Sequence, residues 1–202
     1  VKTGLLIRSG RLSNASKEDI HILKDLYHLN AVVDFRIIRE RIDSPDVKID
    51  GVTYYTLPLV DDKSPMVGGV HKRSANNQNP LSYFIEVIKQ GHGKSDMYVK
   101  LFKSERFQKG MTSFFQILLN NDGEHSILWH CAAGKDRAGS AAALTLLALG
   151  VDKETVLTDF DLSNIAYNEW IQKRLTQVSR ITRDPEILTV VRSLSGVNAD
   201  YM

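Results

Sequence analysis

The sequence has one cysteine, no long apolar run and almost no net charge, and each shortage excludes a class of protein. A single cysteine cannot build a disulfide framework, so the chain suits a reducing compartment. A membrane-spanning helix needs about 18 consecutive apolar residues, and the sequence contains no such run. The net charge of +2 comes without a dense block of lysine and arginine, so the composition does not support nucleic-acid binding.

The rest of the composition is that of a globular domain. With 202 residues, 43% of them hydrophobic, the chain can bury the core of one domain. Neither repeats nor an interdomain linker divide residues 1–202, so we expect a single domain. The chain starts with Val1 rather than Met, so a cytoplasmic location and secretion after removal of an N-terminal signal are both open. The oligomeric state is open as well.

The single cysteine lies in the most informative stretch, ILWHCAAGKDRAG at 127–139. A short apolar run leads to Cys131, and Arg137 follows it at the spacing Cys-x5-Arg. Strong helix formers then continue over 137–149, with Gly150 as a C-cap. The start of such a helix directs free backbone N–H groups and a positive dipole end at the loop, where an anion can bind. A cysteine in such a place is commonly a thiolate, the form that attacks phosphorus.

The loop residues suit a phosphate-binding site. Small or polar side chains let the backbone N–H groups curl inward as an anion nest. The residues concerned are Ala132, Ala133, Gly134, Lys135 and Asp136. Gly134 permits a positive φ, and Arg137 can hold two phosphate oxygens at once. Lys135 is expected to add positive charge at the pocket mouth, unless it is a solvated loop lysine. His130 is expected to orient the loop from outside. The alternative for Cys131 is an inert buried thiol.

The segment HCAAGKDRAG at 130–139 closely resembles the signature of the cysteine-dependent protein tyrosine phosphatases, and its Gly-Lys-Asp-Arg part is similar to a bacterial branch of that family. Other motifs follow in the family's order. They are RSGRL at 8–12, VDFR at 33–36 with Glu40, Pro45 and Asp46, LPLVD at 57–61, DFDLSN at 159–164 and GVNADY at 196–201. One position departs from the family, which usually has Ser or Thr after the arginine, where this chain has Ala138.

The resemblance implies hydrolysis of phosphomonoesters through a phosphocysteine intermediate, without a cofactor or metal. Cys131 would be the nucleophile and Asp61 the general acid, with Asp136 as the rival acid. Asp34 and Arg36 would brace the loop from below. Phosphotyrosine is the first expected substrate, with phosphoserine, phosphothreonine and phosphoinositides beside it.

Alternatives remain for several of these assignments. Asp34 and Arg36 also fit a surface ion-pair cluster, and Asp61 fits a solvated turn carboxylate. Ala138 leaves open a phosphate-binding pseudophosphatase, because the missing hydroxyl is expected to help the sulfur leave the phosphocysteine. A redox thiol enzyme would need a second cysteine, which the chain lacks.

The alternation of strand-like and helix-like patterns predicts an α/β domain, a central mixed sheet flanked by helices as in tyrosine and dual-specificity phosphatases. Strands are predicted at 5–8, 31–35, 53–59 and 126–130. Helices are predicted from a capping box at Ser16 and Asp19 through Leu29, and at 81–90, 105–120, 137–149, 153–160, 163–179 and 185–194. The insertion at about 64–104 is expected to form a helical lid that moves over the site, or else a helix packed permanently on the sheet. His71 and His92 lack ligand spacing, so no metal is expected there.

Overall fold

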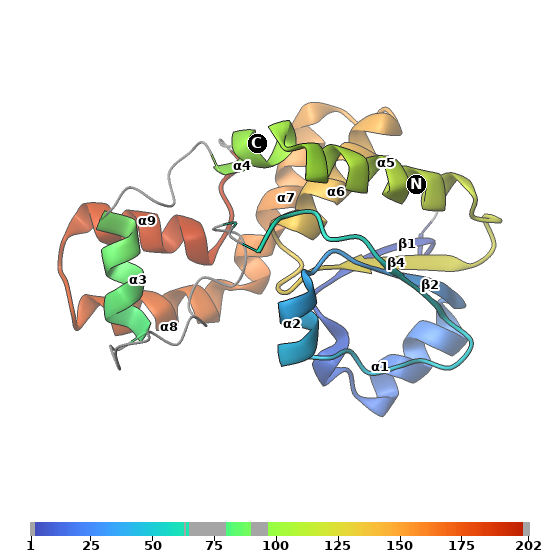
Figure 1. The fold of residues 1–202 in the computed structure, drawn as a ribbon, viewed down its shortest axis with the longest axis horizontal. Coiled ribbons are helices and arrows are strands. Elements are labelled where there is room, and N and C mark those ends of the chain that lie inside the picture. Colours follow the sequence, from blue (N-terminus) through green and yellow to red (C-terminus); the bar gives the residue numbers. More distant parts are fainter. Residues whose placement is uncertain (1–2, 63, 65–79, 90–96, 200–202) are drawn as a thin grey trace.

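A parallel sheet forms the centre of the chain in a computed structural model that describes residues 3–62, 64, 80–89 and 97–199 (Figure 1). The strands are β1 (Leu6–Ser9), β2 (Leu29–Asp34), β3 (Thr53–Thr56) and β4 (Ser126–His130). They lie in the order β1-β4-β2-β3, and every pairing is parallel. The α/β class is therefore confirmed, while the described sheet is parallel rather than mixed. Helical segments cross over between successive strands, and such crossovers return the chain in the same direction.

Helices cover both faces of the sheet (Figure 1). On one face lie η1 (Leu12–Asn14), α1 (Lys17–His21), the π-helical turn η2 (Ile22–Leu26) and α2 (Ile38–Asp43). On the other lie α4 (Met97–Lys103), α5 (Glu105–Leu119), α6 (Arg137–Ala148) and α7 (Lys153–Ala166). Side chains alternate between the faces: Val33 and Trp129 join the larger core below α5 and α6, and Val32 and Leu128 join the smaller one.

Three strands end together at one edge of the sheet. Ser9 of β1 and Asp34 of β2 both pair with His130 at the end of β4. The carboxyl ends of parallel strands bring the following loops side by side, which is where ligands bind in open α/β sheets. The loop after β4 is the Cys-x5-Arg segment, and it therefore lies between the loops that follow β1 and β2.

The remaining helices form a bundle beside the sheet. They are α3 (Pro80–Lys89), α8 (Asn168–Ser179) and α9 (Pro185–Ser195) (Figure 1). Ile85 and Ile88 of α3 are buried against Val178 of α8 and against Ile187 and Val191 of α9. The predicted helix at 81–90 is thus present, but it packs on helices rather than on the sheet.

The second described helix of the insertion is α4, whose Tyr98 and Leu101 belong to the larger core. Most of the rest, 65–79 and 90–96 with His71 and His92, lies outside the described residues. Closure of the insertion over the site remains a proposal. Among the described helices, none combines the length and apolarity that a bilayer crossing requires.

Several element boundaries differ from the sequence-based expectation. The capping box at Ser16 is confirmed, but Leu29 belongs to β2 and not to the preceding helix. α7 continues to Ala166, past the break expected at 161–162. The apolar patterns of 105–120 and 163–179 predict Leu119 and Trp170 in the core, yet they are 83% and 43% exposed. Leu119 is the last residue of α5, and the ends of helices are predicted least reliably from sequence.

Candidate active site

The Cys-x5-Arg segment forms a tight loop between β4 and α6, referred to below as the phosphate loop (131–137). Cys131 is buried at the end of β4, and the Gly134 N–H points at its sulfur across 3.2 Å. Gly134 has φ +73°, and a Cβ there would lie 2.5 Å from the Ser9 carbonyl oxygen. Only glycine fits this turn, since both the backbone conformation and the space exclude a side chain. The loop also accepts a hydrogen bond at Ala132 O from the Arg11 N–H (3.3 Å).

Arg137 is the first residue of α6, and Glu40 of α2 fixes its buried guanidinium. Nη1 donates to Glu40 Oε2 at 2.6 Å, and Nη2 donates to Oε1 at 2.7 Å. Nη1 also faces the Phe35 carbonyl at 3.4 Å. These partners occupy one edge of the fork and leave the Nε–Nη2 edge for two phosphate oxygens. Burial alone would lower the pKa of Arg137, but Glu40, Cys131 and Asp136 outweigh it and raise the pKa, so the group stays charged.

A buried ionic cluster lies below the loop. Arg36 Nε donates to Asp34 Oδ1 at 2.9 Å, and Nη2 pairs with both Asp34 and Asp46. His130 Nε2 lies 3.3 Å from Asp46 Oδ2, and Nδ1 donates to the Cys131 carbonyl at 3.2 Å. Because Asp34 and Arg36 are buried, the alternative of a surface ion-pair cluster is wrong. The contacts fit the expected bracing of the loop by Asp34, Arg36 and His130.

The same cluster sets the ionisation of Asp46. Burial would raise the pKa of Asp46, but the close contact with His130 and the charge of Arg36 outweigh it and lower the pKa. Asp34, Asp46 and His130 could in principle hold a metal ion, since their ligand atoms lie within 4.8 Å of one another. Arg36 already pairs with both carboxylates and supplies the positive charge that an ion would bring, so we assign no metal here.

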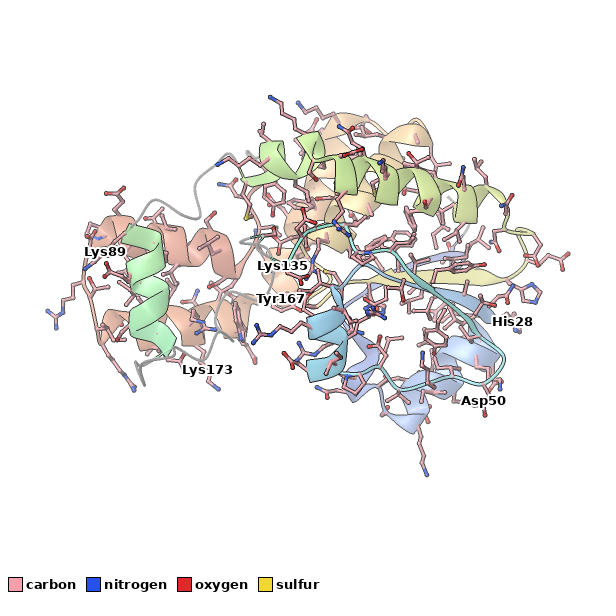
Figure 2. All side chains as sticks on the ribbon, viewed as in Figure 1. His28, Asp50, Lys89, Lys135, Tyr167 and Lys173 are labelled. Atoms are coloured by element: carbon pink, nitrogen blue, oxygen red, sulfur yellow. The ribbon has the colours of Figure 1, made fainter. Side chains whose placement is uncertain are left out.

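Lys135 does not lie at the pocket mouth, which corrects the expectation from the sequence. Its Nζ donates to the carbonyls of Gly196 (2.6 Å) and Leu194 (2.9 Å), at the C-terminal end of α9. Nζ also lies 3.2 Å from Asp136 Oδ2. The side chain is buried, and the ammonium joins the phosphate loop to α9, whose C-terminal end attracts cations. Figure 2 shows Lys135 where the sheet part of the molecule meets the C-terminal helices.

Two tyrosines that no sequence motif had indicated contact the phosphate loop. The Tyr98 hydroxyl of α4 donates to Asp136 Oδ1 at 2.7 Å. The hydroxyl of Tyr167, between α7 and α8, donates to the Ala133 carbonyl at 2.6 Å (Figure 2). Both belong to segments far from the loop in sequence, so only the fold brings them there. Glu40 was part of the family resemblance, but nothing in the sequence indicated its contact with Arg137.

The two acids proposed for proton transfer lie in different surroundings. The Asp61 side chain is 68% exposed and forms an ion pair with Arg106 of α5. Asp136 is part of the phosphate loop, where Tyr98 and Arg137 feel the charges of both Cys131 and Asp136. In the arrangement described, Asp136 is therefore the carboxylate that belongs to the loop of Cys131, and Asp61 is engaged with Arg106 at the surface.

Comparison with known proteins agrees with this geometry. The whole chain, residues 1–202, matches the tyrosine phosphatase family. The chain belongs to the tyrosine phosphatase family. It is 29% identical over 205 residues to a candidate tyrosine-protein phosphatase of Cupriavidus necator, covering 100% of this chain and 67% of that protein. It is 32% identical over 85 residues to the triple specificity protein phosphatase PtpB of Mycobacterium tuberculosis, covering 38% of this chain and 30% of that protein.

Ala138 departs from the hydroxyl residue that the family resemblance implies directly after the arginine. Its methyl group is fully buried in the first turn of α6, and its carbonyl accepts a hydrogen bond from Trp129 Nε1 at 3.1 Å. Ser140, the next hydroxyl along α6, is fully buried, and its Oγ has no hydrogen-bond partner among the described residues. The chain therefore has a buried methyl group at the position where the resemblance led us to expect a hydroxyl.

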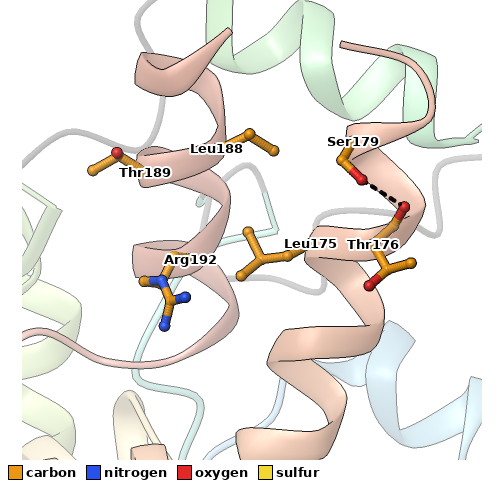
Figure 3. Close-up of a pocket in the computed structure, with 6 residues that line it drawn as sticks. All are labelled: Leu175, Thr176, Ser179, Leu188, Thr189 and Arg192. Atoms are coloured by element: carbon orange, nitrogen blue, oxygen red, sulfur yellow. Dashed lines mark hydrogen bonds between the residues drawn. The ribbon is translucent and has the colours of Figure 1, made fainter. Parts of the chain in front are cut away.

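A surface hollow lies away from the phosphate loop, between α8 and α9 (Figure 3). It has a volume of about 340 Å³ and is lined by Leu175, Thr176, Ser179, Leu188, Thr189 and Arg192. No residue of the phosphate loop takes part in this lining. We therefore place the chemistry at Cys131 and not in the hollow.

Proposed function

We propose that this member of the tyrosine phosphatase family hydrolyses phosphomonoesters through a phosphocysteine on Cys131. The observation that carries the proposal is a buried cysteine at the end of β4 in the same loop as Arg137, whose guanidinium Glu40 holds in place. The sulfur attacks phosphorus as the bond to the leaving oxygen breaks. The loop N–H groups and the free edge of Arg137 stabilise the charge on the equatorial oxygens.

The leaving oxygen needs a proton, and Asp136 is the first choice for its source because it lies in the phosphate loop. Asp61 takes this role only if its loop leaves Arg106 and moves toward Cys131. In the second step a water molecule attacks the phosphocysteine, the carboxylate accepts the water's proton, and the sulfur leaves as thiolate. The variants Asp136→Asn and Asp61→Asn discriminate between the two acids. The variant that lacks the general acid should lose one limb of its kcat–pH profile, and the other variant should keep both limbs.

Phosphotyrosine is the first substrate we propose, with phosphoserine, phosphothreonine and phosphoinositides as further ones. The relative PtpB is named as a phosphatase of triple specificity, which supports this breadth. Positive charge from Lys135 at the pocket mouth would have favoured phosphoinositides, but its ammonium is bound at the end of α9 and does not support them. Arg11 is an exposed cation next to the loop, since its backbone N–H bonds Ala132.

A second candidate function is phosphate binding without efficient turnover, and the buried methyl group of Ala138 favours it. Without a hydroxyl there, the sulfur of the phosphocysteine loses an expected hydrogen bond as it becomes a thiolate. First attack does not need that bond. A stalled phosphocysteine is the consequence that separates this function from the first.

The deciding experiment is turnover of p-nitrophenyl phosphate by the wild type and by Cys131→Ser, with the early time course resolved. Steady turnover that the variant lacks supports the phosphatase. A burst of one product per enzyme with a steady rate at least about 100-fold slower indicates a stalled phosphocysteine, and Ala138→Ser should then raise the steady rate. Absence of both burst and turnover refutes the enzymatic function.

A further inference from the structure

Tyr98 reaches the phosphate loop from α4, outside every motif of the sequence. Its side chain is 2% exposed, and its hydroxyl donates to Asp136 Oδ1 at 2.7 Å. The ring packs edge-on against Phe160, with centroids 5.8 Å apart. Phe160 in turn lies against Gly139 of α6, where a Cβ would come within 2.8 Å of the ring. The core therefore holds the ring in one place, and the hydroxyl stays beside the carboxylate.

The hydroxyl of Tyr98 keeps its proton. Burial raises the pKa of Tyr98 far above its ordinary value, and Asp136 and Cys131 raise it further, because a second negative charge beside them is unfavourable. A neutral phenol can both donate and accept a hydrogen bond. Tyr98 can thus serve a neighbouring carboxyl group in either protonation state without itself losing a proton.

The second oxygen of Asp136 has a partner of another kind. Oδ2 lies 3.2 Å from Lys135 Nζ, and the carbonyls of Leu194 and Gly196 hold that ammonium in place. An ammonium only donates, so it cannot accept a proton carried by Oδ2. A proton on Asp136 therefore fits at Oδ1, where the Tyr98 hydroxyl can turn and accept it as a hydrogen bond.

We propose that Tyr98 is a positioning residue that presents Asp136 for proton transfer; this rests on the phosphatase mechanism above. When Asp136 carries the proton, the Tyr98 oxygen accepts from it. In the first step that proton passes to the leaving oxygen as the P–O bond breaks and the S–P bond forms. Asp136, now a carboxylate, accepts the Tyr98 O–H and then takes the proton of the attacking water as the S–P bond breaks. The Tyr98 O–H bond rotates between these two arrangements, and Tyr98 keeps its proton throughout.

Tyr98→Phe tests the proposal because it keeps the ring and removes only the hydroxyl. We expect kcat for phenyl phosphate to fall about 10-fold while KM stays within about twofold, since a lost hydrogen bond to a charged group is of this size. The loss should be smaller for p-nitrophenyl phosphate, whose leaving group needs a proton less. One limb of the kcat–pH profile should move. In an Asp136→Asn background, Tyr98→Phe should change kcat by less than about twofold.

Tyr167→Phe is the matched control. It removes another hydroxyl from the loop, but one that bonds the Ala133 carbonyl and no carboxylate. It should change KM and leave the limbs of the pH profile in place. The proposal is overturned if Tyr98→Phe lowers kcat equally in the wild-type and Asp136→Asn backgrounds and leaves both limbs of the kcat–pH profile in place.

Two further outcomes are separable. If Tyr98→Phe does not fold, 3-fluorotyrosine at position 98 keeps the hydroxyl and alters its acidity; unmoved limbs in that protein also overturn the proposal. A wild type without turnover rejects the phosphatase mechanism and this role with it. Turnover by the wild type that Tyr98→Phe retains in full rejects the role of Tyr98 alone.

Discussion

The contact between Glu40 and Arg137 yields the sharpest prediction, because it bears on both the stability of the fold and the proposed binding of phosphate. Glu40→Gln keeps the length of the side chain and one acceptor oxygen. The new amide NH₂ then faces one of the guanidinium nitrogens that now donate at 2.6 and 2.7 Å. A donor facing a donor cannot form a hydrogen bond, so one of the two bonds is lost and the remaining one loses its charge assistance.

The magnitude follows from burial. Breaking a buried ion pair by removing one charge costs about 3–5 kcal/mol, because the other charge stays behind uncompensated. The Glu40 side chain keeps 12% of its exposure and glutamine keeps one bond, so the lower end, about 3 kcal/mol, applies. For a domain of this size each kcal/mol lowers Tm by roughly 2–4 °C, which gives a fall of roughly 6–12 °C.

Glu40→Gln should also lower catalytic activity, by a mechanism separate from the loss of stability. Glu40 leaves the Nε–Nη2 edge of Arg137 directed at the loop, and a freed guanidinium samples other orientations. We expect kcat/KM for an aryl phosphate to fall by roughly 10- to 100-fold. This is less than the roughly 100- to 1,000-fold cost of removing one fixed donor, because the guanidinium is loosened and not removed. Thermal unfolding with and without inorganic phosphate, and steady-state kinetics below the new Tm, measure the two effects.

Glu105→Gln serves as the control, since it removes an exposed ion pair with Lys109 on α5. Exposed pairs contribute little, so its Tm should change by less than about 2 °C and its kcat/KM hardly at all. If Glu40→Gln behaves like this control in both assays, Glu40 does not orient Arg137, and the argument from the bidentate contact is refuted.

Three further predictions concern the loop and its support. Asp46→Asn should lower the free energy of unfolding at pH 7 by about 1–3 kcal/mol. Because folding lowers the pKa of Asp46, the carboxylate stabilises the fold above about pH 4, and this stabilisation is lost as the pH falls through the folded pKa. In thermal unfolding, the difference in Tm between Asp46→Asn and the wild type should therefore shrink below about pH 4. A difference that grows there contradicts the assignment. Lys135→Gln should lower Tm by several degrees yet change the inhibition constant of phosphate by less than about threefold, and a tenfold weaker inhibition would return the ammonium to the pocket. Gly134→Ala should abolish turnover and phosphate-dependent thermal stabilisation, because its Cβ meets the Ser9 carbonyl; retained activity contradicts the described turn.

The sequence alone determined the class of the fold and the place of the phosphate loop. Both depend on local features: strand β4 follows from an unbroken apolar run, and α6 follows from a run of strong helix formers closed by Gly150. The loop needs a glycine at a positive φ, and Gly134 has one. Chemistry that depends on neighbours along the chain is readable from the chain, so the family could be inferred from HCAAGKDRAG.

Tertiary structure alone decided which charges face the loop. Lys135 and Arg137 stand two residues apart, yet one binds the end of α9 and the other binds Glu40 of α2. Tyr98 and Tyr167 reach the loop from α4 and from the α7–α8 junction, and Asp61 pairs with Arg106 instead. A buried charge takes the partner that packing brings within about 3 Å, and such a partner can lie anywhere in the sequence. No pattern of spacing along the chain records that choice.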